Sequence, residues 1–249
     1  MISRKYNKSI KVSIITVCFN SEKTIRTTIE SVLYQTYKNI EYIIVDGKSS
    51  DSTVKIIKEY IPLFKGRLRY VSEKDKGIYD AMNKGIRLST GDLIGIINSD
   101  DFYEIDAVEN VIKYMGFRKY QVLYGYCNII YKNRITKTVK AHHTKLSNDM
   151  IPHPTCFVTR PTYQNFGLFL SSFQIASDYE LMLRFYKSRQ VTFIQVPKII
   201  ANFRQGGIST KPEMEIRRVI EKVCILYRFS EISIKELIVS IYKYLIFGK

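Results

Sequence analysis

Short apolar runs alternate with segments of helical periodicity through the first hundred residues of this 249-residue chain. Residues 12–17 and 40–45 are rich in β-branched side chains, as strands buried on both faces are. Between them, apolar residues recur at three- and four-residue spacing, which predicts helices that cover a sheet. Strands that alternate with helices join through right-handed crossovers. We therefore expect an α/β fold with a mostly parallel central sheet, its first four strands at 12–17, 40–45, 67–71 and 93–97.

Acidic residues follow two of these expected strands. Asp46 comes directly after residues 40–45, and Asn98-Ser99-Asp100-Asp101 comes directly after residues 93–97. In parallel sheets, ligands bind beyond the carboxyl ends of the strands. The sequence therefore predicts a binding site that contains Asp46, Asp100 and Asp101.

The pattern changes after about residue 118, where strands no longer alternate regularly with helices. The expected elements are a hairpin at 122–131 and 135–139, strands at 156–159, 192–196 and 199–203, and a helix from Asp178. The last segment is helical and basic. We therefore divide the chain at 1–118, 119–210 and 211–249, the first two being halves of one domain.

Asp100 and Asp101 are adjacent carboxylates, which repel each other unless a cation lies close to them. A divalent ion held by carboxylates and by substrate phosphates is a usual arrangement for Mg²⁺ or Mn²⁺. Alternatively, the pair caps a helix that begins near Ile105. On these residues alone, the two interpretations are equally open.

The loop after the second strand is Asp46-Gly47-Lys48-Ser49-Ser50-Asp51. Asp51 is expected to cap the next helix. Capping does not explain a carboxylate at Asp46, which can accept a hydrogen bond from a base or ribose.

The formal net charge of +16 indicates an anionic partner, which can be a nucleic acid, an acidic lipid or a phosphorylated substrate. Four well-separated cysteines favour reduced thiols over a disulfide framework or zinc site. The N-terminus lacks the apolar core of a signal peptide, and no run reaches the roughly 18 apolar residues that span a bilayer. We therefore expect a cytoplasmic protein, either free or bound to a membrane surface.

Four motifs occur in order along residues 10–210: Ser13-Ile14-Ile15-Thr16 with Asn20, Val45-Asp46-Gly47-Lys48-Ser49-Ser50-Asp51-Ser52-Thr53, Gly91-Asp92 and Asn98-Ser99-Asp100-Asp101. Together they resemble the family 2 glycosyltransferases, which are inverting enzymes of the GT-A fold. The segment Glu73-Lys74-Asp75-Lys76-Gly77-Ile78-Tyr79-Asp80-Ala81-Met82-Asn83-Lys84-Gly85 is similar to the subset that builds bacterial surface polysaccharides.

The resemblance implies a nucleotide-sugar-binding first half and an acceptor-binding second half. Asp101 is implied as the principal ligand of a divalent metal, Mn²⁺ or Mg²⁺, with Asp100 at the metal or the ribose. The matched or associated residues on the nucleotide-sugar side are Thr16, Asp46, Asp75, Asn83, Lys84, Asp100 and Arg204. Two positions depart from the family pattern, because Asn98 and Gly47 stand where many relatives have aspartate.

The resemblance also assigns the acceptor side. Asp178, in Ala176-Ser177-Asp178-Tyr179-Glu180-Leu181, is implied as the general base that takes the acceptor's proton. From the residues alone, a charge favoured by the dipole at the start of a helix is the preferred explanation of Asp178, and the resemblance shifts the preference to catalysis. Glu180 is expected to orient or ion-pair, because it points about 200° away along the helix. His153 is implied as an acceptor-side or phosphate-side contact, and Glu180 as a further acceptor-binding residue.

The predicted reaction transfers a sugar from a nucleotide diphosphate donor, with a UDP-sugar favoured, to a glycan or polyprenyl-diphosphate-linked acceptor. The basic C-terminal segment suits peripheral contact with the anionic inner face of the cell membrane, or packing against the domain with its basic face solvated. A sugar-1-phosphate nucleotidyltransferase would carry a glycine-rich loop after the first strand, and Thr16-Val17-Cys18-Phe19-Asn20 has no glycine. No basic-aromatic motif predicts nucleic acid binding.

Overall fold

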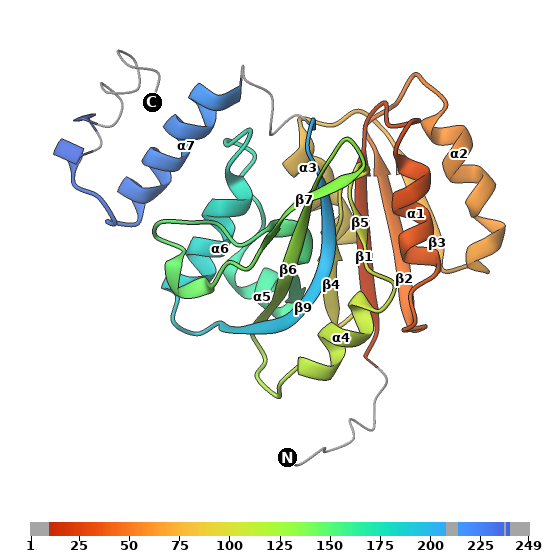
Figure 1. The fold of residues 1–249 in the computed structure, drawn as a ribbon, viewed down its shortest axis with the longest axis horizontal. Coiled ribbons are helices and arrows are strands. Elements are labelled where there is room, and N and C mark those ends of the chain that lie inside the picture. The colour runs from red at the N-terminus through yellow and green to blue at the C-terminus, as the bar shows by residue number, and fades with distance from the viewer. Residues whose placement is uncertain (1–9, 208–213, 237, 240–249) are drawn as a thin grey trace.

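The computed structural model describes residues 10–207, 214–236 and 238–239. Within these residues the chain forms a nine-stranded sheet with the strand order β3-β2-β1-β4-β8-β6-β9-β5, and β7 pairs with β6 outside this path. Figure 1 shows the sheet running through the centre of the molecule. The strands are β1 (Val12–Cys18), β2 (Ile40–Asp46), β3 (Leu68–Ser72), β4 (Leu93–Ile96), β5 (Phe102–Tyr103), β6 (Gln121–Tyr131), β7 (Arg134–Val139), β8 (Phe157–Thr159) and β9 (Thr192–Arg204).

Strands β1 to β4 form the parallel half of the sheet, as the alternation of strands and helices predicts. β1 lies between β2 and β4, and it runs parallel to both. The register places Cys18 at the end of β1 beside Asp46 at the end of β2. The carboxyl ends of these strands therefore meet at one edge.

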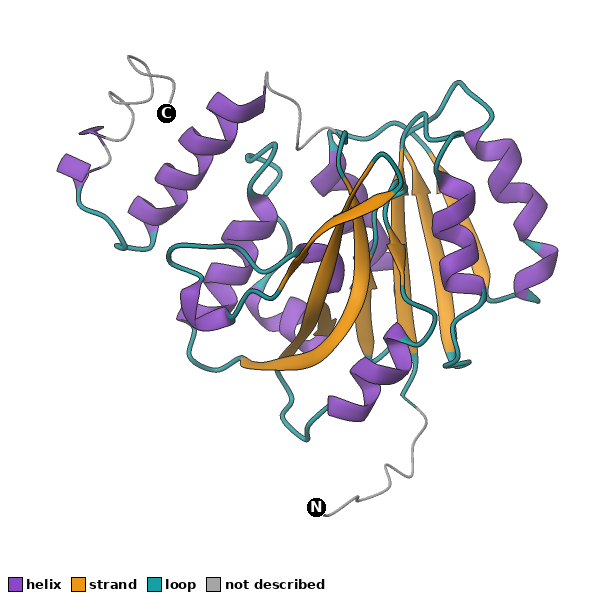
Figure 2. Ribbon diagram, viewed as in Figure 1, coloured by secondary structure: helices purple, strands orange, loops and turns teal. Residues whose placement is uncertain are grey.

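Helices cover both faces of the sheet (Figure 2). Apolar residues of α1, α2 and α4 belong to the core on one face, and those of α3, α5 and α6 belong to the core on the other. This two-sided cover explains why β1 and β2 are buried throughout. The helices are α1 (Ile25–Leu33), α2 (Thr53–Tyr60), α3 (Ile78–Leu88), α4 (Ala107–Tyr114), α5 (Arg160–Phe166), α6 (Ser177–Lys187) and α7 (Glu215–Arg228).

The second half contains the expected hairpin, in which β6 and β7 are joined at Lys132 and Asn133, both with positive φ. Residues 192–203, expected as two strands, instead form the single strand β9, which continues through Pro197. The β6–β9 register shifts around Gly125 opposite this point. A Cβ at Gly125 would lie 2.3 Å from Ile200 Cγ1, so only glycine lets the two strands approach across the irregularity.

Helix α7 packs against α6 through buried residues that include Val223 and Ile225. Its other face exposes Ile216 and Arg217, followed by Tyr227 and Arg228. The helix therefore both packs on the domain and presents a mixed apolar and basic surface. Lys243, which belongs to the predicted basic segment, lies outside the described residues. No helix among the described residues has the length and apolar character needed to cross a membrane.

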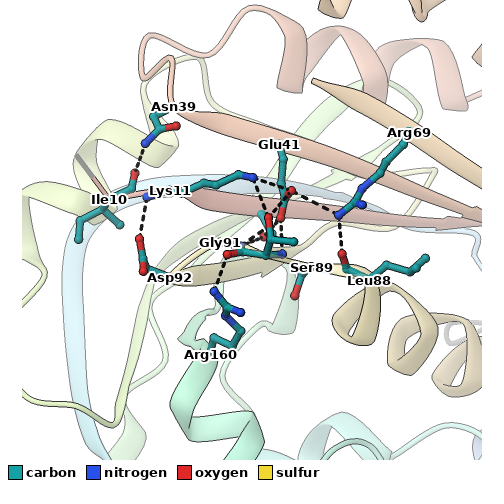
Figure 3. A network of polar contacts seen from close by, with 12 residues as sticks. Ile10, Lys11, Asn39, Glu41, Arg69, Leu88, Ser89, Gly91, Asp92 and Arg160 are labelled. Atoms are coloured by element: carbon teal, nitrogen blue, oxygen red, sulfur yellow. Dashed lines mark hydrogen bonds and ion pairs between the residues drawn. The ribbon is translucent and has the colours of Figure 1, made fainter. Parts of the chain in front are cut away.

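The amino ends of the parallel strands carry a polar network around Glu41 (Figure 3). The Glu41 carboxylate accepts hydrogen bonds from the Ser13 hydroxyl at 2.5 Å and from the backbone N–H of Thr90 and Gly91. A Cβ at Gly91 would lie 2.6 Å from the backbone nitrogen of Ser13, so this position requires glycine. Asp92 accepts from the backbone N–H of Lys11. The Gly91-Asp92 motif therefore lies at the edge opposite Asp46, where it joins β4 to β1.

Candidate functional site

Two loops at the carboxyl ends of the parallel strands are bonded to each other through α1 and the segment before it. The Ser21 hydroxyl lies 2.8 Å from the Ser99 hydroxyl, and the Ser21 N–H donates to Thr53. The Thr28 hydroxyl donates to the backbone carbonyl of Asp101 at 2.6 Å. These contacts hold the Asp46 loop and the 98–101 loop at one edge, as the strand pattern predicts.

Asp101 is fully buried at this edge, and only one of its two carboxylate oxygens has a hydrogen-bond partner among the described residues. Oδ1 accepts the backbone N–H of Arg204 at 2.9 Å, whereas Oδ2 has no hydrogen-bond partner among the described residues. The side-chain oxygen of Asn98 is buried and unpartnered in the same way. Unpaired buried oxygens are costly, and each such group requires an explanation.

Asp100 lies beside Asp101 and is partly accessible. Burial raises the pKa of Asp100, and burial together with the charge of Asp100 raises the pKa of Asp101 well above its usual value. The Arg204 side chain donates to the backbone carbonyl of Asp100 at 3.1 Å and lies over the Phe102 ring. The protein therefore gathers two carboxylates, leaves a carboxylate oxygen of Asp101 and the amide oxygen of Asn98 unpaired, and supplies one nearby guanidinium.

Helix capping does not account for this acidic pair. The next helix, α4, begins at Ala107 after Asp106, and β5 lies between it and Asp101. Carboxylate and amide oxygens are the ligands that Mg²⁺ and Mn²⁺ prefer, so the donor set of Asn98, Asp100 and Asp101 fits such an ion. Among the described residues no cluster of three or more acidic, histidine or cysteine side chains could hold a metal alone. A cation here would need oxygens from water or a ligand.

The structure places Thr16 and Asp46 inside the edge rather than on its surface, because both are fully buried. The Tyr42 hydroxyl donates to the Thr16 hydroxyl at 2.9 Å. The Asp46 carboxylate accepts from the backbone N–H and hydroxyl of Ser49 and from the hydroxyl of Ser72. These bonds give both residues a role in shaping the loop. Their contact with a nucleoside stays a prediction.

Asp51 bonds the start of α2, although the N-cap itself is Ser52. The Asp51 carboxylate accepts the backbone N–H of Thr53, the first residue of α2.

Phe19 is an exposed aromatic residue at this edge, and the sequence motifs did not indicate it. It follows β1 directly, and 62% of its surface is accessible. A Cβ at Gly47 would lie 3.4 Å from the Phe19 ring and 3.1 Å from the Asp75 carboxylate, so glycine leaves these two groups close together. The available signal was a large aromatic residue placed directly after a buried strand.

Lys84 on α3 fixes Asp75. Its ammonium group lies 2.6 Å from the Asp75 carboxylate and 2.9 Å from that of Glu73. Burial alone would lower the pKa of Lys84, but the two carboxylates outweigh it and raise that pKa. The side chain of the adjacent Asn83 is used differently, since it bonds both backbone groups of Phe169. Lys84 therefore holds the loop that contains Glu73 and Asp75, whereas Asn83 ties α3 to the second half.

Asp178, His153 and Tyr79 form a second group, where α3 meets the second half of the domain. Asp178 is partly accessible in the first turn of α6, and its Oδ1 lies 3.1 Å from the Tyr79 hydroxyl. Burial lowers the pKa of His153, and the charge of Asp178 opposes this shift. A neutral imidazole therefore lies near a carboxylate. Because Tyr79 and Lys84 both belong to α3, this helix connects the two groups of site residues.

Glu180 is fully buried and bonds the Arg184 guanidinium through both carboxylate oxygens, the shortest contact being 2.7 Å. Arg184 in turn donates to the backbone carbonyls of Phe166 and Leu168. This ion pair agrees with the predicted salt-bridging role. The separate prediction of acceptor contact by Glu180 has no further support in this geometry.

Comparison with known proteins agrees with the sequence resemblance. The profile of Glycosyl transferase family 2 matches residues 13–188, so the chain belongs to this family. It is similar to the chondroitin synthase of Escherichia coli, with 43% identity over 98 residues, which are 39% of this chain and 14% of that protein. It is also similar to a PGL/p-HBAD biosynthesis glycosyltransferase of Mycobacterium bovis, with 26% identity over 202 residues, 79% of this chain and 78% of that one.

Solved structures confirm the GT-A fold. S. aureus TarS 1-349 in complex with UDP-GlcNAc aligns with a TM-score of 0.69 at 15% identity, over 95% of this chain and 72% of that one. The mannosyltransferase PcManGT from Pyrobaculum calidifontis, in complex with GDP-Man and Mn²⁺, aligns with a TM-score of 0.65 at 15% identity, over 98% and 74%. The protein is therefore a glycosyltransferase of family 2 with the expected fold.

Proposed function

We propose that the protein transfers a hexosyl group from a nucleoside diphosphate sugar, a UDP-sugar in the first instance, to an acceptor hydroxyl with inversion at the anomeric carbon. The observation that carries this proposal is the acidic pair at the carboxyl edge of a family 2 sheet, in which the buried Asp101 has an unpaired oxygen. Such an edge is where an α/β sheet binds nucleotides. UDP-GlcNAc and GDP-Man in the complexes of TarS and PcManGT support a donor of this chemical class.

A divalent cation, Mn²⁺ or Mg²⁺, would be held by Asp100 and Asp101 with the amide oxygen of Asn98. It would supply Lewis-acid neutralisation of the diphosphate that leaves. Asp100 is the accessible member of the pair, whereas Asp101 is buried and already bonded to the backbone of Arg204. We therefore assign the principal contact to Asp100, reversing the order that the sequence resemblance implies. Asp101 holds the end of β9 next to it.

The positive charge of Arg204 lies on the same side as the acidic pair. It stabilises negative charge that develops on the leaving phosphate oxygen. Phe19 offers an exposed ring on which the base stacks, and Asp75, held by Lys84, lies beside it. Thr16 and Asp46 support this surface from below through their internal hydrogen bonds.

Asp178 acts as the general base. Its carboxylate takes the proton of the acceptor hydroxyl while the acceptor oxygen bonds to the anomeric carbon and the bond from that carbon to the phosphate oxygen breaks. Because attack and departure occur on opposite faces, one displacement inverts the configuration. The Tyr79 hydroxyl orients the Asp178 carboxylate, and neutral His153 lies at its side to contact the acceptor.

The acceptor is proposed to be a glycan or a polyprenyl-diphosphate-linked glycan in the synthesis of a bacterial capsule, O-antigen or exopolysaccharide. The outer face of α7 supports this, because Ile216 and Tyr227 are exposed beside Arg217 and Arg228. Exposed apolar side chains interleaved with basic ones suit the surface of an anionic membrane. The protein would then work at the inner face of the cell membrane.

The test is a transfer assay with a panel of UDP-, GDP- and dTDP-sugars, with Mn²⁺ or with chelator, on wild type, Asp178→Asn and Asp149→Asn. Asp149 is an exposed acid on the same half of the domain and serves as the matched control. Asp178→Asn should lose about 10²–10⁴-fold in transfer rate, yet keep the rise in melting temperature that the donor nucleotide gives. Asp149→Asn should match wild type. Failure of every donor to bind folded wild type would overturn the proposal.

A further inference from the structure

A buried carboxylate from the C-terminal helix reaches the backbone just before Asp178. Glu221 lies on α7, outside the residues 13–188 that match the family, and only 9% of its surface is exposed. Its Oε1 accepts the backbone N–H of Gln174 at 2.9 Å. Its Oε2 accepts the backbone N–H of Ile175 at 2.9 Å and of Ala176 at 3.0 Å. One side chain therefore uses three consecutive backbone donors.

These three residues lead directly into α6. Ala176 is the N-cap of α6, and its own side chain makes no capping hydrogen bond. The carboxylate of Glu221 therefore supplies the negative charge that a helix start favours, from a helix 45 residues further along the chain. Asp178 is the second residue of α6, so its place depends on how this turn is held.

The same turn is held from its other side by Tyr79. The Tyr79 hydroxyl lies 2.7 Å from the carbonyl oxygen of Ile175 and 3.1 Å from Oδ1 of Asp178. Ile175 is thus fixed through its N–H by Glu221 and through its carbonyl by Tyr79. Glu221, Tyr79 and Asp178 form one continuous chain of contacts that runs from α7 to the acceptor side of the site.

Other residues of α7 reinforce the contact with α6. Lys222 donates to the backbone carbonyl of Asn148 at 2.9 Å and lies over the ring of Tyr179, the residue after Asp178. Ile225 is fully buried in the core that also contains α6. Glu221 therefore belongs to a packed interface, and its carboxylate is the part that bonds the Asp178 turn.

We propose that Glu221 is a positioning residue for Asp178, so that the C-terminal helix completes the acceptor side of the active site. The inference rests on the proposed role of Asp178 as the base. Loss of the Glu221 carboxylate leaves three backbone donors without their acceptor and lets the turn move. A displacement of about 1 Å in a reacting group costs roughly 10²-fold in rate.

Glu221→Gln tests this with little change in shape, because the amide offers only one acceptor oxygen and places an NH₂ group against backbone N–H donors. Transfer should fall roughly 10- to 100-fold in kcat, by analogy with the loss of other supporting contacts. The Kd for the donor nucleotide should stay within about twofold, since the acidic pair lies elsewhere. The acidic limb of the kcat–pH profile should also move, because the surroundings of the base have changed.

Glu215→Gln is the matched control, as Glu215 is an exposed glutamate in the first turn of the same helix. A double-mutant cycle with Tyr79→Phe adds a second measurement. If the two residues act through one turn, the loss of transition-state stabilisation in the double mutant should be smaller than the sum of the losses in the two single mutants. If Glu221→Gln is unstable, Glu221→Asp, which keeps the charge but withdraws it by one methylene, is measured in the same way.

Folded Glu221→Gln with wild-type kcat and pH profile would overturn the positioning role. Equal losses in kcat and donor affinity, or strict additivity with Tyr79→Phe, would also overturn it by indicating general loosening. A wild-type enzyme without transfer activity would instead overturn the proposed function itself. The two failures are therefore distinguished by the wild-type assay.

Discussion

Both ends of the parallel strands carry carboxylates, and Glu41 at the amino end has many partners that the pair Asp100 and Asp101 at the carboxyl end lacks. At the amino end, Glu41 accepts from Ser13, Thr90 and Gly91 and ion-pairs with Lys11 at 2.9 Å and Arg69 at 3.4 Å (Figure 3). At the carboxyl end, Asp100 and Asp101 repel each other, and Oδ2 of Asp101 has no partner among the described residues.

The pKa values follow this difference. Burial would raise the pKa of Glu41, but hydrogen bonds from Ser13, Thr90 and Lys11 outweigh it and lower that pKa to about 2. Burial raises the pKa of both Asp100 and Asp101, and the single backbone bond from Arg204 does not reverse the shift at Asp101. A carboxylate with full partners stabilises the fold, whereas one left incomplete is prepared for a ligand that brings positive charge.

The largest expected effect comes from the carboxyl edge, where the acidic pair lacks partners. Asp100→Asn removes the accessible carboxylate and should lower metal-dependent transfer by about 10³-fold, as expected for several kcal/mol of lost charge stabilisation. Stability without metal should hold or rise, because the repulsion with Asp101 is gone. Initial rates across a Mn²⁺ titration and a urea melt measure both quantities. A variant that is unstable yet fully active per folded molecule would contradict the comparison.

Glu41→Gln makes the same kind of change at the amino edge, where the carboxylate has many partners. It should lower stability and leave activity unchanged, the opposite of Asp100→Asn. Loss of a charge that several donors and two cations surround should lower the free energy of unfolding by about 2–3 kcal/mol. The value of kcat should stay near that of wild type. Glu59→Gln, which removes an exposed partner of Arg26, is the control and should cost less than about 1 kcal/mol. If Glu41→Gln and Glu59→Gln lowered the free energy of unfolding in urea equally, the Glu41 network would stabilise the fold no more than an exposed ion pair does.

Sequence patterns predicted the parallel half and the place of the acidic pair well. These predictions used local signals, namely hydrophobic periodicity, β-branched runs and the polar residues that follow each strand. Such signals were enough to place Asp46, Asp100 and Asp101 at one edge. The same reasoning missed β5 and α5, which have two and seven residues and lack enough length for a periodic signal. It also divided β9, because Pro197 indicates a break unless the partner strand adapts, as β6 does at Gly125.

Partners of the polar side chains were beyond sequence reasoning. Glu41 sits within an apolar run and gives no sign that Thr90, 49 residues later, will bond it. The bonds that Ser72 donates to Asp46 and that Ile175 donates to Glu221 likewise depend on how distant elements pack. Residue type and spacing identify which groups can do chemistry. Only the tertiary structure shows which of them are already occupied.

Acid titration should separate the two edges by sign. Because the folded pKa of Glu41 is about 2, its stabilising effect is present above its usual value near 4.5 and fades as pH falls toward 2. The raised pKa values of Asp100 and Asp101 act in reverse. Their favourable contribution is present below the usual value near 3.8 and is lost as pH rises through the folded pKa.

Melting temperatures of wild type, Glu41→Gln and Asp100→Asn from pH 3 to 8 measure this. The gap between wild type and Glu41→Gln should narrow below about pH 4.5, whereas any gain from Asp100→Asn should grow as pH rises. Added Mn²⁺ should raise the wild-type melting temperature more at pH 7.5 than at pH 5, because protons compete with metal for the carboxylates. Parallel curves for all three proteins would be inconsistent with the opposite shifts.

The smallest expected effect concerns Phe19, an exposed and uncharged side chain at the carboxyl edge. Stacking of a base on an aromatic ring is worth about 1–3 kcal/mol, so Phe19→Ala should raise the Kd for the donor nucleotide about tenfold. Tyr34→Ala is the matched control. Tyr34 and Phe19 are equally exposed, with 62% of each residue's surface accessible, and Tyr34 lies at the C-cap of α1 instead of beside Gly47. Calorimetric titration of both variants measures the difference. Equal affinities would assign base binding to the Asp75 side of the loop, whereas a loss confined to Phe19→Ala would show that this edge combines an incompletely bonded carboxylate pair with an exposed ring that binds the base.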